Sequence, residues 1–226
     1  GIAVNLAQLV DRLRVESGAS GFPITTVEGN LAYETSRLKK WAQDAWRDIQ
    51  TMYQWRFLFQ EAVFTVPQYA SVITPPEFTA KQVADWLEDT VRIAPFGGAR
   101  KDSQPMRCAD YFDFRDGEGI DPTKRGKPSV ISIHPNSESL LIAPSADQQY
   151  TLFYDYYREP QELDDNDDVP LMPARFHELI VWEALIRYGG YEESAPVLQR
   201  AARQAAPLWS SLMHDQLPKM ELASLG

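Results

Sequence analysis

The sequence has few of the side chains on which metal sites and most catalytic centres depend. Among its 226 residues there is one cysteine, and the three histidines are dispersed along the chain at His134, His177 and His214. A single cysteine excludes an intramolecular disulfide framework and is typical of a protein made in a reducing cytosol. Without a second cysteine, or two histidines four residues apart, no structural zinc site is expected.

Recognisable nucleotide-binding and nucleophile motifs are absent as well. The chain has no G-x-G-x-x-G fingerprint, no phosphate-binding loop and no G-x-S-x-G turn around a nucleophilic serine. The acidic run at residues 164–168 fails as a calcium loop, because Val169 stands where the turn needs glycine and Arg175 stands where a glutamate ligand belongs. The sequence therefore predicts a protein that is not an enzyme, with no catalytic residue, no cofactor and no metal.

Long apolar runs are also missing. No segment approaches the roughly 18 apolar residues of a membrane span, and no basic region followed by an apolar block marks a signal peptide. Large apolar side chains are nevertheless abundant, with six Trp, ten Tyr and ten Phe. This composition argues against disorder. We expect a soluble globular protein that is made in a cytoplasm and has no membrane partner.

The net charge of −10 is concentrated in the middle of the chain. Residues 56–172 hold eleven basic and twenty acidic side chains, whereas residues 1–55 hold six of each. Binding to DNA normally requires Lys and Arg, which release counterions from the phosphates. The acidic excess therefore indicates either a surface that serves solubility or a surface that repels nucleic acid.

Helical periodicity occurs at both ends of the chain. Asn5 and Gln8 form a capping-box pattern before a first helix, and the apolar repeat predicts a second helix from about Asn30 to about Trp55. Further helices are expected over residues 173–188 and from about Ser194. Pro207 is expected to kink or restart the last helix, because proline removes one helical hydrogen bond.

Between the helical ends the period changes to two residues, which is typical of strands. The run 115–127 is expected to be a long exposed loop, and the run 80–87 can be read as either helix or strand. The sequence thus predicts an α+β fold, in which residues 1–55 and 173–226 form a helical bundle and residues 56–172 form an inserted antiparallel β module. The expected strands are Phe57–Val66, Thr90–Ala94, Met106–Phe114, Val130–His134, Leu140–Ala143 and Tyr150–Arg158.

One continuous stretch, residues 150–193, combines a strand, an acidic loop bounded by prolines, and the start of an apolar helix. This order, with a YY-R-x-P strand end and a P-x-x-F-H-x-L-I helix start, resembles the head–tail adaptor proteins of tailed bacteriophages. The layout of helices and strands extends the resemblance over most of the chain. The matching positions are Tyr156, Tyr157, Arg158, Pro160, Leu163, Pro173, Phe176, His177, Leu179 and Ile180.

The resemblance implies a structural function in the neck of a phage virion. Proteins of this kind form a homo-oligomeric ring of about a dozen copies, which joins the portal protein to a tail, nozzle or stopper protein. DNA passes through such a ring without specific binding. Carried onto this chain, the resemblance suggests an acidic loop that faces the channel or the tail, with Asp116, Glu118 and Asp121. It also suggests a portal-docking arm with Trp209, Leu212, Met213, Leu217, Met220 and Leu222.

Two hypotheses of other classes stay open at this stage. The β module could bind a small ligand or a glycan, which a ligand screen would detect. The dispersed carboxylates could belong to a hydrolase, which turnover assays after Asp→Asn substitutions would expose.

Overall fold

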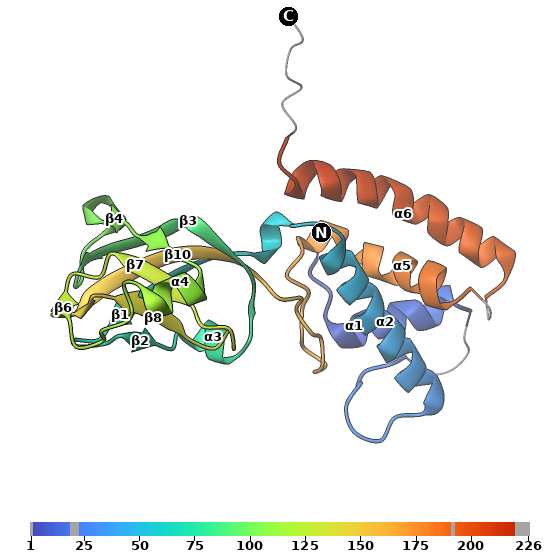
Figure 1. Cartoon of the computed structure of the whole chain (residues 1–226). Coiled ribbons are helices and arrows are strands. Elements are labelled where there is room, and N and C mark those ends of the chain that lie inside the picture. The colour runs from blue at the N-terminus through green and yellow to red at the C-terminus, as the bar shows by residue number, and fades with distance from the viewer. Residues whose placement is uncertain (1, 19–22, 191–192, 220–226) are drawn as a thin grey trace, which may run out of the picture. The chain divides into compact units, whose positions relative to one another are not determined.

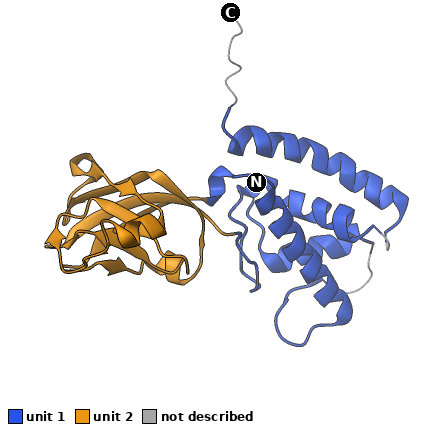
Figure 2. Ribbon diagram, viewed as in Figure 1, with its two compact units in different colours: residues 1–58, 160–226 blue, residues 59–159 orange. Residues whose placement is uncertain are grey.

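The computed structural model describes residues 2–18, 23–190 and 193–219 of the chain. It is a mixed α+β protein whose helices and strands fall into two compact units (Figure 2). The helical unit comprises residues 1–58 and 160–226, and the β unit comprises residues 59–159. The sequence prediction places the second boundary after residue 172, whereas the segment from Pro160 onward groups with the helices.

Helix α1 (Leu6–Glu16) begins where the capping pattern predicts. The Asn5 side chain accepts a hydrogen bond from the Gln8 amide, and the Gln8 side chain accepts one from the Asn5 amide, both at 2.9 Å. These bonds occupy N–H groups that have no partner within the first helical turn. The apolar face of the helix is buried, with Leu6, Leu9, Val10 and Leu13.

Helix α2 (Tyr33–Met52) is shorter at both ends than predicted. Tyr53 leaves the helix with extended φ and ψ angles of −147° and 164°. The Trp55 indole then donates to the Ile49 carbonyl at 2.6 Å, which folds the chain back over the last helical turns. The apolar repeat does not reveal this exit, because the residues after the helix are still aromatic.

Near the other end, a 3-10 turn (Ala174–Phe176) precedes α5 (Glu178–Tyr188), and α6 (Ala195–Gln216) follows. Helix α5 contacts α1, α2 and α6 (Figure 1). Seven consecutive residues of α5 are buried, from Leu179 to Leu185, and all of them except Glu183 are apolar, as expected for a helix that packs on several neighbours. Helix α6 continues through Pro207, so of the predicted kink or restart the restart does not occur.

The acidic loop, residues 161–172, packs on the start of α1. The main-chain carbonyls of Asp168 and Asn166 accept the amides of Leu6 and Ala7 at 2.8 and 3.2 Å. The Asn166 side chain also accepts the Val27 amide at 2.6 Å. The loop therefore satisfies two more donors of the first helical turn, and these bonds tie it to the helical unit.

Two four-stranded sheets form the β unit, with the orders β1-β10-β3-β4 and β2-β8-β7-β5. Most strand pairs are antiparallel, as predicted, but β5–β7 and the separate pair β6–β9 are parallel. The strands are β1 (Phe59–Val66), β2 (Val72–Ile73), β3 (Val83–Pro95), β4 (Gln104–Pro105), β5 (Arg107–Cys108), β6 (Arg125–Gly126), β7 (Val130–Ile133), β8 (Leu140–Ala143), β9 (Ser145–Ala146) and β10 (Tyr150–Arg158).

Strand β10 has neighbours on both sides and is buried on both faces. Leu152 and Tyr154 point into a core that also contains Ile93 of β3 and Ile142 of β8. Phe153, which points to the opposite face, is also buried. The two-residue period predicts at least one buried face, and the central position of the strand accounts for the second.

Two segments of the β unit differ from the sequence prediction. The predicted strand at residues 106–114 ends at Cys108, and helix α4 (Tyr111–Asp116) follows. The Asp110 side chain caps α4 by accepting the Phe112 amide at 3.1 Å, so a capping signal was present in the sequence. The undecided run at residues 80–87 divides between the turn after α3 (Pro76–Thr79) and the start of β3.

Candidate functional site

Within the described residues, no group of three or more His, Cys, Asp and Glu side chains could hold a metal ion. In the same part of the chain, no helix is long and apolar enough to cross a membrane. The three histidines are divided between the units, since His134 lies in the β unit whereas His177 and His214 lie in the helical unit. The features that remain are surfaces and packing contacts.

His177 is buried and has a structural environment. Its Nδ1 atom accepts the Val4 amide at 3.0 Å, and its Nε2 atom lies 2.7 Å from the Met172 carbonyl. A neutral ring that is protonated on Nε2 satisfies both bonds. Burial lowers the pKa of His177, which also favours the neutral form. The ring therefore fastens the N-terminal segment to the start of α5.

Most of the described residues of the predicted docking arm belong to α6. Leu212 is fully buried, so in this conformation it packs within the helical unit. Trp209 is half-buried: its ring stacks on Trp55 at 6.2 Å, and its indole donates to the carboxylate of Glu183 at 2.5 Å. Met213 and Leu217 are partly exposed, and Met220 and Leu222 lie outside the described residues.

The predicted acidic loop of the β unit is exposed at Asp116, Glu118 and Asp121. Each carboxylate has a partner nearby: Asp116 pairs with Arg115 at 3.0 Å, and Glu118 pairs with Arg107. Asp121 accepts the hydroxyl of Thr123 at 2.6 Å. These hydrogen bonds lower the pKa of Asp116 and of Asp121. The three carboxylates are therefore exposed, and each has a hydrogen-bonding or ion-pair partner within the β unit.

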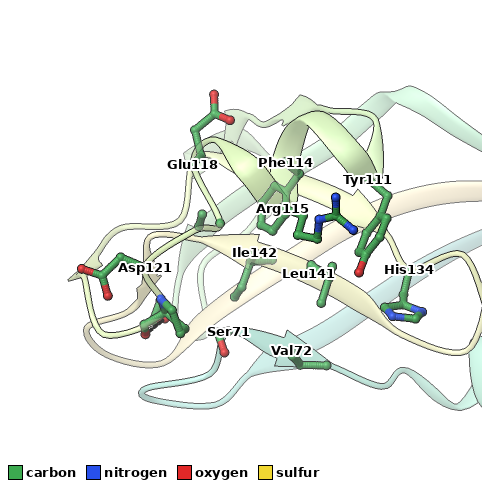
Figure 3. A pocket seen from close by; sticks show the side chains of 14 residues that line it. Ser71, Val72, Tyr111, Phe114, Arg115, Glu118, Asp121, His134, Leu141 and Ile142 are labelled. Carbon is green, nitrogen blue, oxygen red and sulfur yellow. Dashed lines mark hydrogen bonds between the residues drawn. The ribbon is translucent and has the colours of Figure 1, made fainter.

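A cavity of about 180 Å³ lies beside this loop, between α4 and strand β8 (Figure 3). Leu141 and Ile142 of β8 and Phe114 of α4 supply apolar lining. Figure 3 shows Glu118 and Asp121 at one end of the cavity, with Tyr111 and His134 at the other. The Tyr111 and His134 rings meet edge to face, with their centroids 5.1 Å apart.

Large apolar side chains are exposed around this cavity. Val72, which contributes to the lining, is 52% exposed. Phe112 and Ile120, which adjoin lining residues in the sequence, are 58% and 70% exposed. Protein interaction sites commonly combine an apolar cavity with exposed apolar side chains next to it. The sequence does not reveal this cavity, because its pattern predicts one strand over residues 106–114 and the cavity depends on α4.

The structure does not unite the two sets of residues predicted from the sequence. The loop with Asp116, Glu118 and Asp121 lies in the β unit, and the described arm residues lie in the helical unit. Each set is therefore a separate candidate surface. The loop with Glu118 and Asp121 adjoins the cavity of about 180 Å³, which both of these residues help to line.

Comparison with known proteins gives the identity of the chain at the level of a family. A search of curated proteins found no match. A protein-family comparison matched residues 4–224 to the family described as SU10 adaptor protein, which confirms the resemblance to head–tail adaptors. Because the match covers almost every residue, the chain belongs to the SU10 adaptor protein family, a family of phage head–tail adaptors.

Proposed function

We propose that this protein is a structural head–tail adaptor in the neck of a phage virion, where copies form a ring that joins the portal to the tail. Membership of the SU10 adaptor protein family, over residues 4–224, is the observation that carries the proposal. The ring encloses the channel through which DNA passes, and the protein catalyses no reaction there. Its partners are the portal protein, a tail-side protein and further copies of itself.

In this proposal, residues 1–55 and 173–226 form a helical bundle that serves as the rigid body of each copy. The contacts of α5 with α1, α2 and α6 support this arrangement. So do the hydrogen bonds of His177, which link the N-terminal segment to the start of α5. Residues 56–172 form the inserted module, of which the acidic loop at residues 161–172 packs on the bundle.

The portal-docking arm begins after α6. Within the described residues, Trp209 and Leu212 anchor α6 to the rest of the helical unit. The chain continues beyond Leu217 with apolar side chains at Met220 and Leu222. Apolar side chains in a segment that follows a helix suit docking into a preformed groove of a partner.

The charge of the β unit suits a surface past which DNA moves. Residues 59–159 hold ten basic and fifteen acidic side chains. Asp116, Glu118 and Asp121 are exposed at one loop of this unit. A surface with an acidic excess repels phosphates and leaves DNA free to slide. We assign this loop to the channel or to the tail-facing side of the ring.

Co-sedimentation with purified portal protein tests the proposed function. The full chain is compared with a chain that ends after Lys219, which keeps α6 and its cap at Leu217 intact. A cut at His214 is less suitable, because it removes Gln216, whose side chain accepts the Phe57 amide at 2.9 Å. The full chain is expected to sediment with the portal, and the shortened chain is expected to fold but stay in solution. Absence of binding by the full chain would contradict the proposal.

A further inference from the structure

One phenylalanine of the β unit is displayed on a firmly held turn. Phe96 is 60% exposed and follows the end of β3. The Gly98 amide donates to the Pro95 carbonyl at 2.8 Å, and the Gly97 amide donates to the Thr151 hydroxyl at 3.0 Å. Gly97 has a φ of +76°, which a residue with a side chain rarely adopts. The turn therefore presents the Phe96 ring to solvent in a defined position.

The cavity beside α4 has the size of a phenyl ring. Its volume is about 180 Å³, and an apolar protein cavity of about 150 Å³ is known to hold benzene. Phe114, Leu141 and Ile142 supply apolar lining for such a ring. Phe96 of the same chain does not line the cavity, and its exposure shows that it fills no other pocket within its own chain.

The charges next to these two features are opposite. Arg100, Lys101 and Asp102, on the 3-10 turn that follows Phe96, are all exposed, so two basic side chains and one acidic side chain give the turn a net charge of +1. At the cavity, the charged lining residues are Arg115, Glu118 and Asp121, so one basic and two acidic side chains give a net charge of −1. Figure 3 shows the carboxylates of Glu118 and Asp121 directed away from Leu141 and Ile142. Opposite charges around an apolar contact steer association and fix its orientation.

We propose that Phe96 of one copy inserts into the cavity of a second copy of this chain, with Arg100 and Lys101 facing Glu118 and Asp121. The contact is heterologous, because one copy contributes the phenyl ring of Phe96 and the next copy contributes the cavity. A heterologous contact generates a closed ring or an open filament, according to the rotation between neighbours. The inference deepens the proposed function, since it assigns a contact between neighbours in the proposed ring.

The contact is tested with two single-residue variants, which are measured separately and as a mixture. Phe96→Ser removes the phenyl ring and leaves the cavity intact. Val72→Trp fills the cavity from an exposed position and leaves the phenyl ring of Phe96 intact. Each variant alone is expected to self-associate at least about tenfold more weakly than the wild type, because a buried aromatic residue often dominates an interface. An equal mixture is expected to form dimers and nothing larger, because Phe96 of the Val72→Trp chain can insert into the intact cavity of the Phe96→Ser chain and no other contact of this kind is possible. Sedimentation velocity distinguishes these species.

Val63→Ser is the matched control. Val63 is 68% exposed in β1 of the same unit, does not belong to the turn after β3 and does not line the cavity. It should self-associate like the wild type. If Phe96→Ser self-associates normally, or if the mixture behaves like each variant alone, the proposed contact is wrong.

Cysteine trapping tests the same contact when association is weak. Phe96→Cys and Val72→Cys chains are mixed under mild oxidation, and an intermolecular disulfide is expected only in the mixture. The native Cys108 interferes little, because burial raises the pKa of its thiol to about 11 and so disfavours the reactive thiolate. Absence of a trapped heterodimer overturns the contact.

Failure of this contact and failure of the adaptor function are distinguishable. If Phe96→Ser still forms portal-bound rings, the contact proposed here is wrong and the adaptor function stands. If the wild-type chain self-associates through Phe96 but never binds portal, the contact stands and the adaptor function is wrong.

Discussion

The main-chain carbonyl of Asp168 accepts the amide of Leu6 at 2.8 Å, which joins the acidic loop at residues 161–172 to the first turn of α1. The side chain of the same aspartate accepts the amides of Asp164 and Asp165 at 2.7 and 2.8 Å. One residue therefore both shapes the loop and holds it against the helix. A run of acidic residues that looks like a solvated segment in the sequence is a structural part of the helical unit.

Replacing Asp168 by Ala should destabilise the protein at neutral pH. Both hydrogen bonds to its side chain are lost, and hydrogen bonds to a charged group contribute about 1.5–3 kcal/mol each in protected sites. Because the loop is partly exposed, we expect a total loss of about 1–2 kcal/mol in the free energy of unfolding. Urea denaturation measures it. Asp167→Ala is the matched control, since Asp167 is exposed and should lose little.

The same bonds predict a pH dependence. Backbone hydrogen bonds from Asp165 and Asp164 lower the pKa of Asp168. A carboxylate with a lowered pKa contributes stability above its ordinary pKa, and this contribution is lost as the pH falls through the lowered value. The stability difference between wild type and Asp168→Ala should therefore shrink in acid. A difference that stays constant down to pH ~2, well below the ordinary Asp pKa of about 3.9, would show that the charge of Asp168 contributes nothing.

His177 should make the helical unit sensitive to mild acid. Burial lowers its pKa below the ordinary value of about 6.5. The unfolded chain therefore takes up a proton more readily than the folded chain, and stability falls as the pH drops below about 6.5 toward the lowered pKa. Thermal melting between pH ~7.5 and ~5 is expected to show a smaller pH slope for His177→Gln than for the wild type. Equal pH slopes for His177→Gln and the wild type would contradict this role of His177.

Trp182 is expected to be a core residue of the helical unit. It is 6% exposed on α5, which contacts α1, α2 and α6. Replacing a buried Trp by Ala removes apolar contacts and leaves a cavity, at a cost of about 3–5 kcal/mol. Trp182→Ala should therefore lower the Tm by many degrees, whereas Tyr33→Ala, at an 81% exposed position, should change it little. A negligible shift for Trp182→Ala would place this side chain at a partner surface.

Duplex DNA should not bind the isolated protein. Phosphate neutralisation by Lys and Arg supplies most non-specific affinity, and the chain carries a net charge of −10. At ~10 mM salt the Debye length is about 30 Å, so repulsion acts over a long range. Fluorescence anisotropy with a labelled duplex should show no binding. Micromolar affinity that weakens steeply with added salt would reveal a basic stripe and contradict a channel through which DNA slides freely.

Local sequence patterns predicted the local structure of this chain. The capping box at Asn5 and Gln8 marks the start of α1, and the alternation in residues 150–158 matches the observed bounds of β10. Both signals depend on neighbours a few residues apart. The prediction failed for α4, where the Asp110 cap was present but the apolar residues around it suggested a strand.

Contacts between distant parts of the chain left no such signal. Val4 and His177 are 173 residues apart in the sequence, and the indole of Trp209 reaches Glu183 on another helix. The cavity beside α4 is built from several separate segments, including Ser71 and His134. No periodicity encodes these pairings, because they depend on how the elements pack. The candidate surfaces were therefore predictable as exposed acidic or apolar segments, but their surroundings were not.

A cryo-EM map of the neck of the virion tests the adaptor function most directly. The account predicts a ring of copies of this chain between the portal and the tail, with the helical unit and the β unit each fitting the density as separate bodies. Acidic side chains, including Asp116, Glu118 and Asp121, are expected to face the channel or the tail. A map in which this chain is absent from the neck, or in which it occupies another part of the virion, would contradict the account.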